Sequence, residues 1–288
     1  MIEQYTAPQS IEEAARVMQA GQVTILAGGT DLMPQSESGK LQLGSTLMNI
    51  RRVDGISGVS IDKNRVRIGA LTTVTEILES EELRAITPVL AHAADCFASA
   101  QLRNAATIGG NLCNASPAGD MIIPLLLLDA EVVLASWSEG VVTERRLPVA
   151  EFFAGPGETR RRTDELLTAI ELAMPQPGFV ARFRKSGPRP ALEISTVSVG
   201  IAGVLEDGAL LAARIALGAA APMPMRATKT EALIEGRYLD ADLIDRAADS
   251  AAEEATPIDD VRASAWYRTH LIRVFTRRLL ADVNASSD

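Results

Sequence analysis

The chain has 288 residues, of which 47% are hydrophobic and 23% charged, so it is long enough for two globular domains with a sizeable core. Its formal net charge of −9 disfavours nucleic acid as a partner, because an acidic protein repels phosphates. Two cysteines exclude a disulfide scaffold, and they cannot ligate an iron–sulfur cluster alone, since such a cluster takes about four thiolates.

The start of the sequence, MIEQYTAPQS, lacks the basic and apolar segments of a signal peptide. The apolar run MIIPLLLL (121–128) is shorter than the roughly 20 residues that cross a bilayer. We therefore expect a cytoplasmic protein without a membrane span.

The first elements follow from capping and strand patterns. Ser10 and Glu13 form a capping box that predicts a helix from Ile11, and Gly21 is a suitable end for it. The β-branched run that follows predicts a buried strand. The first glycine pair, in TILAGGTDLMPQ (24–35), therefore lies where a strand ends.

The middle of the chain alternates between strand and helix patterns. RVRIGAL (65–71) and EVVLAS (131–136) predict strands, Thr73–Glu76 is another capping box, and Thr87-Pro88 predicts a helix start. The second glycine pair lies in ATIGGNLCNASPAGD (106–120). Ser116 and Pro117 then resemble the N-cap and first residue of a helix that carries the apolar run.

MPQPG (174–178) is a candidate domain boundary. Beyond it, two apolar runs joined by Asp207-Gly208 predict a β-hairpin, Thr228 is expected to cap a helix, and residues 264–280 predict an amphipathic helix with its arginines outward. The predicted fold class is α+β: a mixed N-terminal part of two lobes, then an antiparallel sheet with packed helices.

Several common sites are not indicated. No G-x-G-x-x-G follows the first strand, and GPGETRRR (155–162) lacks the lysine and hydroxyl of a P-loop. His92 and Cys96 have the spacing of half a metal site, but no second half is visible, so we expect them to be buried structural residues.

Each glycine pair is followed by a hydrogen-bonding side chain, Thr30 or Asn111. Because glycine permits a positive φ, successive amides can turn toward one anion. Two such segments facing each other could hold a pyrophosphate. Alternatively, each pair is only a tight turn, and the residues alone leave both interpretations open.

The two glycine segments in this order resemble the FAD-binding subunit of the molybdenum hydroxylases, the xanthine dehydrogenase and carbon monoxide dehydrogenase family. IGALTTVTEI (68–77), LPVAEFFAGPGETRRRTDELLTAIEL (147–172) and FRKSGPRPALEIS (183–195) extend the resemblance over nearly the whole chain. It implies a two-lobed FAD-binding domain of the PCMH/VAO type over 1–174, with lobes of about 1–53 and 54–174. A domain like the C-terminal domain of the CO dehydrogenase flavoprotein would follow over 178–284.

The resemblance also implies site residues. The first segment would hold the FAD pyrophosphate through its backbone, with Ala27, Gly28, Gly29, Thr30, Asp31 and Leu32. The second would complete that grip with Thr107, Gly109 and Gly110, continued by Asn111 and Asn114. Asp120 would bind the ribityl or ribose hydroxyls of FAD. Leu167 would lie by the adenine or flavin region, and Lys185 would lie near the isoalloxazine.

These last three residues have plainer interpretations. Asp120 could lie in the first turn of the predicted helix, where the helix dipole favours a carboxylate. Lys185 could be a solvated strand lysine, and Leu167 a core residue.

The implied function is an electron-transfer subunit without catalytic residues of its own. A large partner would oxidise substrate at a molybdenum cofactor, and a small partner would pass electrons through [2Fe-2S] clusters to FAD and on to an external acceptor. The three kinds of subunit would assemble as a dimer of heterotrimers. Within the family the chain resembles the medium subunit of the quinoline 2-oxidoreductase type. Other types remain open: carbon monoxide, nicotine or hydroxybenzoyl-CoA enzymes, a stand-alone NAD(P)H-dependent flavin oxidoreductase, or a non-catalytic scaffold.

Overall fold

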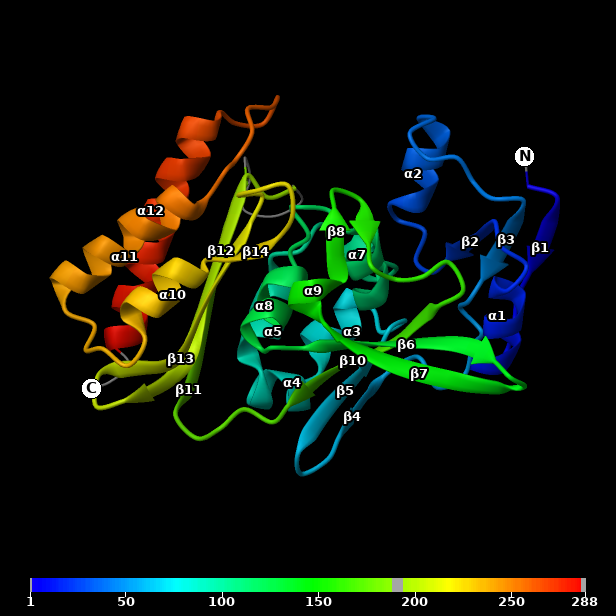
Figure 1. The fold of residues 1–288 in the computed structure, drawn as a ribbon, viewed down its shortest axis with the longest axis horizontal. Helices are drawn as coiled ribbons and strands as arrows, with labels where there is room; N and C mark the ends of the chain where they lie inside the picture. The colour runs from blue at the N-terminus through cyan, green and yellow to red at the C-terminus, as the bar shows by residue number, and fades with distance from the viewer. Residues whose placement is uncertain (1, 188–193, 286–288) are drawn as a thin grey trace.

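The computed structural model describes residues 2–187 and 194–285. The chain crosses the molecule from N-terminal strands at the right of Figure 1 to C-terminal helices at the left. Within the described part of the chain, none of the helices combines the length and hydrophobicity that a bilayer-spanning segment requires.

The first sheet is small and parallel, with strand order β1-β3-β2. Ser10 caps the first helix as predicted, since its Oγ accepts from the Glu13 amide at 3.1 Å. The Glu13 carboxylate in turn accepts from the Gln9 amide at 2.8 Å. The elements here are β1 (Gln4–Thr6), α1 (Ile11–Met18), β2 (Val23–Leu26), α2 (Leu32–Glu37) and β3 (Thr46–Asn49).

The second sheet is antiparallel, with order β4-β5-β10-β6-β7. Its strands are β4 (Val59–Ile61), β5 (Arg65–Gly69), β6 (Glu131–Ser138), β7 (Val141–Pro148) and β10 (Leu166–Ala173). A separate two-stranded hairpin of β8 (Phe153–Gly155) and β9 (Glu158–Thr159) comes between β7 and β10 in the chain. The helices of this part are α3 (Val74–Glu79), α4 (Glu81–Ile86), α5 (Pro88–Asp95), α6 (Ala100–Arg103), α7 (Ile108–Asn114), α8 (Ile122–Leu127) and α9 (Val149–Phe152).

The C-terminal sheet is also antiparallel, with order β11-β12-β13-β14. Asp207 and Gly208 form the predicted hairpin turn, with φ of +47° and +76°. The elements are β11 (Phe179–Ser186), β12 (Val197–Glu206), β13 (Ala209–Gly218), β14 (Met225–Arg226), α10 (Thr228–Ile234), α11 (Ala241–Glu254) and α12 (Ala265–Asn284). The predicted α+β class is confirmed.

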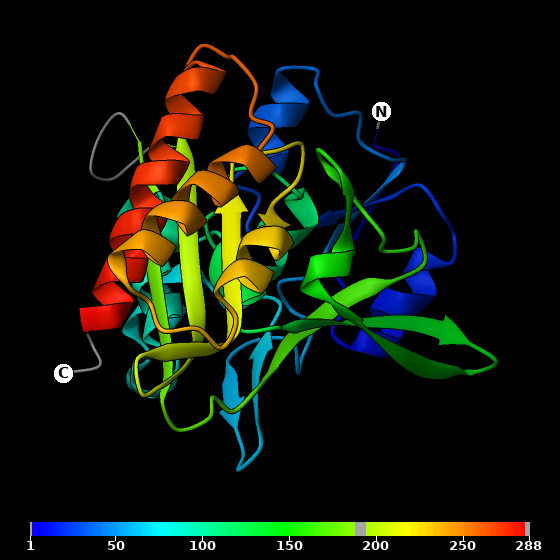
Figure 2. The same cartoon turned by 60° about the vertical axis from the view of Figure 1, so that its left-hand side comes forward.

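Strand alternation gives this last sheet two buried faces. Val199 and Ile201 pack with the helices that lie in front of the sheet in Figure 2. Phe183 and Ala202 face the other way and join the core of the preceding part, where α5 and α8 lie between the two sheets (Figure 1). At Gly200 a Cβ would lie 2.6 Å from Leu127, so glycine there permits the close approach of α8.

Four local predictions are wrong. The helix after the second glycine pair begins at Ile122, so Ser116 and Pro117 lie in a turn before it. Thr228 is the first residue of α10, and the residue at its N-cap is Ala227. One arginine of α12, Arg268, is buried because it donates to the Thr196 carbonyl (2.7 Å) and to Asp260 (2.8 Å). His92 is exposed and packs edge-on against the Phe183 ring.

Candidate functional site

The first glycine segment follows β2, which runs parallel to β3. Gly29 has φ of +74°, a conformation that favours glycine, and a Cβ there would lie 3.1 Å from the Leu26 side chain. Among the residues that the structure describes, none accepts a hydrogen bond from the backbone amides of residues 28–31. This segment therefore presents several consecutive free donors.

The second glycine pair lies inside helix α7, which Thr107 caps by accepting from the Gly110 amide at 3.0 Å. The Gly109 amide donates to Ala70 O at 2.9 Å, and the Asn111 amide donates to Thr107 O at the same distance. The residues alone left open whether both pairs turn free amides toward an anion, and at the second pair these amides are already bonded within the protein. A Cβ at Gly109 would lie 2.7 Å from Ala70, so this glycine permits close packing instead.

The two segments meet although they are distant in sequence. A Cβ at Gly28 would lie 2.0 Å from Ala105 O, so only glycine allows this contact between backbones. Gln35 links α2 to α7, since its side-chain Nε2 donates to Asp31 Oδ2 at 2.6 Å and to Asn114 Oδ1 at 3.2 Å.

A cavity of about 980 Å³ lies over this junction. Its volume falls at the large end of the range of about 300–1,000 Å³ that is typical of cofactor sites. Every site residue implied by the resemblance lines it except Lys185: Ala27, Gly28, Gly29, Thr30, Asp31, Leu32, Thr107, Gly109, Gly110, Asn111, Asn114, Asp120 and Leu167. The structure therefore brings these residues to one place.

Asp120 lies just before α8, outside its first turn, and its carboxylate is almost fully buried. Lys185 Nζ donates to Asp120 Oδ2 at 2.5 Å and to Cys96 O at 3.0 Å, and its side chain is only 7% exposed. Ser195 Oγ donates to the other Asp120 oxygen, also at 2.5 Å. Burial raises the pKa of Asp120, although the Lys185 ammonium and its hydrogen bond oppose that shift.

These contacts exclude two of the plainer interpretations: Lys185 is not solvated, and Asp120 is not in the first helical turn. Leu167 is a core residue that also lines the cavity. Residues 188–193 of the segment between Lys185 and Ser195 lie outside the described residues.

Sequence reasoning missed several residues of the site. Gln35 and Ser195 act through their contacts with Asp31, Asn114 and Asp120. Arg262 reaches the cavity from the loop between α11 and α12. No spacing pattern relates these residues to the glycine pairs, so only the fold reveals them.

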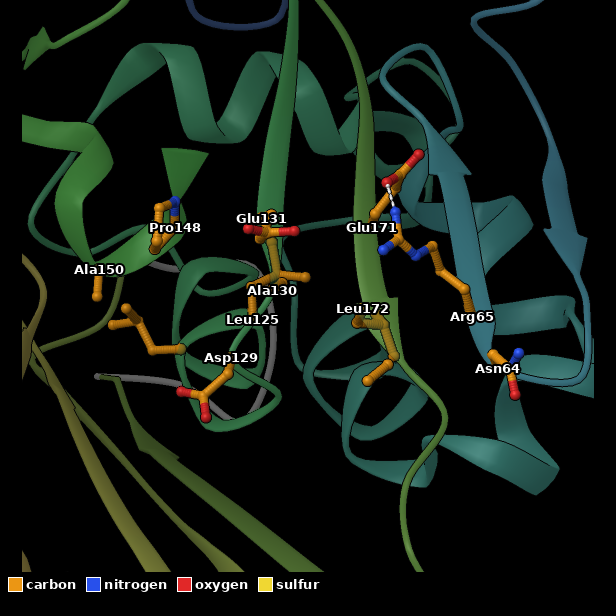
Figure 3. A pocket seen from close by; sticks show the side chains of 12 residues that line it. Asn64, Arg65, Leu125, Asp129, Ala130, Glu131, Pro148, Ala150, Glu171 and Leu172 are labelled. Atoms are coloured by element: carbon orange, nitrogen blue, oxygen red, sulfur yellow. Dashed lines mark hydrogen bonds and ion pairs between the residues drawn. The ribbon is translucent and has the colours of Figure 1, made fainter. Parts of the chain in front are cut away.

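A second cavity of about 450 Å³ lies at the strand ends of the second sheet, where β5 and β6 begin and β7 and β10 end, and none of the predicted site residues lines it. Figure 3 shows Arg65 reaching Glu171 in its wall. Arg67 and Arg146 also donate to this carboxylate, at 2.7 Å and 3.0 Å. Burial disfavours the charged form, but these hydrogen bonds outweigh it and lower the pKa of Glu171. The charge is thus compensated within the protein, as in a structural ion-pair cluster.

Comparison with known proteins identifies the family of both parts of the chain. Residues 1–175 match the family model described as the FAD binding domain in molybdopterin dehydrogenase, and residues 182–283 match the CO dehydrogenase flavoprotein C-terminal domain. The chain belongs to the FAD-binding subunits of the molybdenum hydroxylase family. It is thus a subunit of an oxidoreductase, with an FAD-binding domain followed by a C-terminal domain.

Two curated relatives of this FAD-binding subunit are each 31% identical. They are the glyceraldehyde dehydrogenase medium chain of Sulfolobus acidocaldarius, over 97% of both chains, and the putative xanthine dehydrogenase FAD-binding subunit of Escherichia coli K12, over 92% of this chain and 90% of that one.

Two solved structures share the fold. Carbon monoxide dehydrogenase from Hydrogenophaga pseudoflava superposes with a TM-score of 0.93 at 27% identity, covering 99% of this chain and 98% of that one. Quinoline 2-oxidoreductase from Pseudomonas putida 86 superposes with a TM-score of 0.90 at 24% identity, covering 99% and 98%. At that identity the second likeness concerns the fold alone.

Proposed function

We propose that this subunit binds one FAD non-covalently in the 980 Å³ cavity and relays electrons through it. The observation that carries the proposal is the run of free amides at residues 28–31, which lines the cavity beside α7. Consecutive backbone amides suit a phosphate because they supply donors without requiring a charged side chain. The pyrophosphate of FAD would lie on this run.

The remaining residues fit the rest of the cofactor. Thr107 accepts from Gly110 but retains a hydroxyl proton that can be donated to a phosphate oxygen. Asp120 accepts one hydrogen bond on each oxygen, and a carboxylate has about four lone-pair sites, so it can also accept from a ribityl or ribose hydroxyl. Leu167 supplies an apolar contact for a ring.

Lys185 does not line the cavity, in contrast to the role implied by the resemblance. Its ammonium is bound to Asp120 and to a backbone carbonyl. We infer that Lys185 orients the Asp120 carboxylate and does not contact the cofactor directly.

Bound FAD would let the complex exchange electrons singly or in pairs. Electrons would come from [2Fe-2S] clusters in a small subunit, supplied by a molybdenum site in a large subunit, and leave to an external acceptor. The two cysteines of this chain are consistent with clusters held elsewhere. The assembly would be a cytoplasmic dimer of heterotrimers, and the domains would span 1–174, with lobes of about 1–53 and 54–174, and 178–284.

For the substrate, we propose an N-heteroaromatic compound such as quinoline, hydroxylated in the large subunit. Relatives named for xanthine and nicotinate support this class. Relatives named for carbon monoxide and glyceraldehyde support the alternative of a different substrate in the same kind of complex. The substrate would be selected by the large subunit and not by this chain.

Native purification followed by cofactor analysis tests the proposal. The expected result is a complex of three kinds of subunit that contains iron and molybdenum and releases FAD on denaturation. A colourless protein would favour a scaffold role. A single-chain flavoprotein reduced by NAD(P)H would favour the stand-alone oxidoreductase.

A further inference from the structure

We propose that Arg51 is a positioning residue that turns the first glycine segment toward the FAD pyrophosphate. The inference rests on the proposed function, because it explains how the free amides of residues 28–31 are held ready for a ligand. Arg51 follows β3 and is not among the described residues that line the cavity.

The parallel pairing of β2 and β3 puts Arg51 beside this segment. Leu26 is opposite Asn49 in the register, and the Ile50 amide donates to Leu26 O at 3.1 Å. The residues that leave the two strands therefore emerge side by side. Asn49 fixes the start of this turn, since its side chain accepts from the Arg51 amide at 3.1 Å and donates to the Tyr5 hydroxyl at 3.0 Å.

The Arg51 guanidinium bonds two successive carbonyls of the segment. Nε donates to Ala27 O at 2.7 Å, and Nη2 donates to Gly28 O at 2.9 Å. In a planar trans peptide the N–H points opposite to the C=O. Fixing these two carbonyls therefore fixes the amides of Gly28 and Gly29, which point away from Arg51.

This arrangement uses a property that lysine lacks. The guanidinium is a rigid, planar fork that can hold two acceptors at once, whereas an ammonium is a point charge on a flexible stem. Glycine at positions 28 and 29 leaves the backbone free to adopt several conformations, so an external clamp is needed to select one. The two hydrogen bonds from Arg51 select this conformation, and they do so from outside the cavity.

The test uses the purified enzyme complex after FAD depletion, with affinity for added FAD measured by quenching of flavin fluorescence. Arg51→Ala should weaken FAD binding by about 10- to 100-fold, the range expected for losing charged hydrogen bonds to the backbone. Arg51→Lys should recover part of the affinity. Arg16→Ala is the control, because Arg16 is an exposed arginine of the same region that pairs with Glu12 on α1.

Guanidinium rescue separates positioning from a general loss of stability. Added guanidinium at millimolar concentration should restore FAD affinity to Arg51→Ala without raising its melting temperature, whereas urea at the same concentration should not. If Arg51→Ala binds FAD as tightly as Arg16→Ala, or if guanidinium and urea have equal effects, the inference is wrong.

The same measurements distinguish this inference from the proposed function. A Gly29→Val variant that keeps FAD would overturn the role of the first glycine segment itself. A Gly29→Val variant that loses FAD, together with an Arg51→Ala variant that binds it normally, would overturn only the role of Arg51.

Discussion

The two glycine pairs line one cavity but use their backbone amides differently. At the first pair, the amides of residues 28–31 have no acceptor within the described part of the chain. At the second, the amides of Gly109 and Gly110 already donate to Ala70 O and Thr107 Oγ1. The first pair is therefore suited to binding a ligand, and the second to holding α7 close to its neighbours.

This difference shows that a glycine pair in a sequence has two distinct meanings. Glycine can permit a positive φ that aligns donors, as at Gly29. It can also remove a Cβ where two segments approach closely, as at Gly109. Gly28 belongs to the second kind although it lies in the first pair, because its missing Cβ makes room for Ala105 O.

The largest effect is expected for Gly28→Ala, which would break the contact between the two segments. Its Cβ would lie 2.0 Å from a backbone oxygen that no rotamer change can move. We expect loss of FAD together with at least about 3 kcal/mol of destabilisation. Denaturant unfolding and flavin content of the complex measure both effects. A variant with wild-type stability would show that the segments do not pack as described.

The next effect concerns Asp120, which follows the second pair. Lys185→Met leaves a buried carboxylate without its cation and should cost about 3 kcal/mol at pH 7. The pKa of Asp120, already raised by burial, should rise further. Because the folded-state pKa would lie further above the unfolded value of about 3.9 than in the unsubstituted protein, this variant should be most stable in acid. It should lose more stability than the unsubstituted protein as the pH rises through the folded-state pKa.

Unfolding of Lys185→Met measured from pH 4 to 8 checks this sign. The double variant Lys185→Met/Asp120→Asn serves as the control and should lose most of the pH dependence. Equal pH profiles for the single and double variants would show that the lysine does not compensate Asp120.

A smaller effect separates the two glycines of the second pair. Gly109→Ala should destabilise the protein by about 2 kcal/mol, because its Cβ would meet the Ala70 backbone. Gly110→Ala meets only the Thr107 hydroxyl at 2.8 Å and should cost less than about 1 kcal/mol, the usual value of an N-cap. Thermal unfolding of both variants measures the contrast, and the reverse order would contradict the packing role assigned to Gly109.

Capping and turn patterns correctly predicted elements whose deciding hydrogen bonds join residues close in sequence. The N-cap at Ser10, the capping box at Thr73 and the hairpin at Asp207-Gly208 are confirmed, although Glu13 accepts from the Gln9 amide and not from Ser10. Pro117 was misleading because proline suits a turn as well as a helix start. Arg268 was misplaced because its partners, the buried Thr196 and the more exposed Asp260, come from segments outside α12.

The resemblance selected the residues of the cavity, but it did not distinguish what each one does. These roles depend on contacts that the sequence does not show, most of them between segments far apart in the chain. Gly28 permits close packing, Gly29 turns the chain, and Lys185 binds Asp120. Arg51 has no motif of its own. One strand precedes Arg51 and another precedes the first glycine pair, and these two strands pair in parallel. That pairing could have placed Arg51 beside the glycine segment.

We propose that the free amides of the first glycine pair hold the FAD pyrophosphate. The most direct test is the flavin content of the complex carrying Gly29→Val, compared with Gly39→Val. Both glycines have a positive φ, +74° and +73°, so both variants experience similar backbone strain, but Gly39 lies outside the cavity in open space.

We predict that both variants fold and that only Gly29→Val loses FAD. A Gly29→Val complex with one FAD per subunit would contradict the claim.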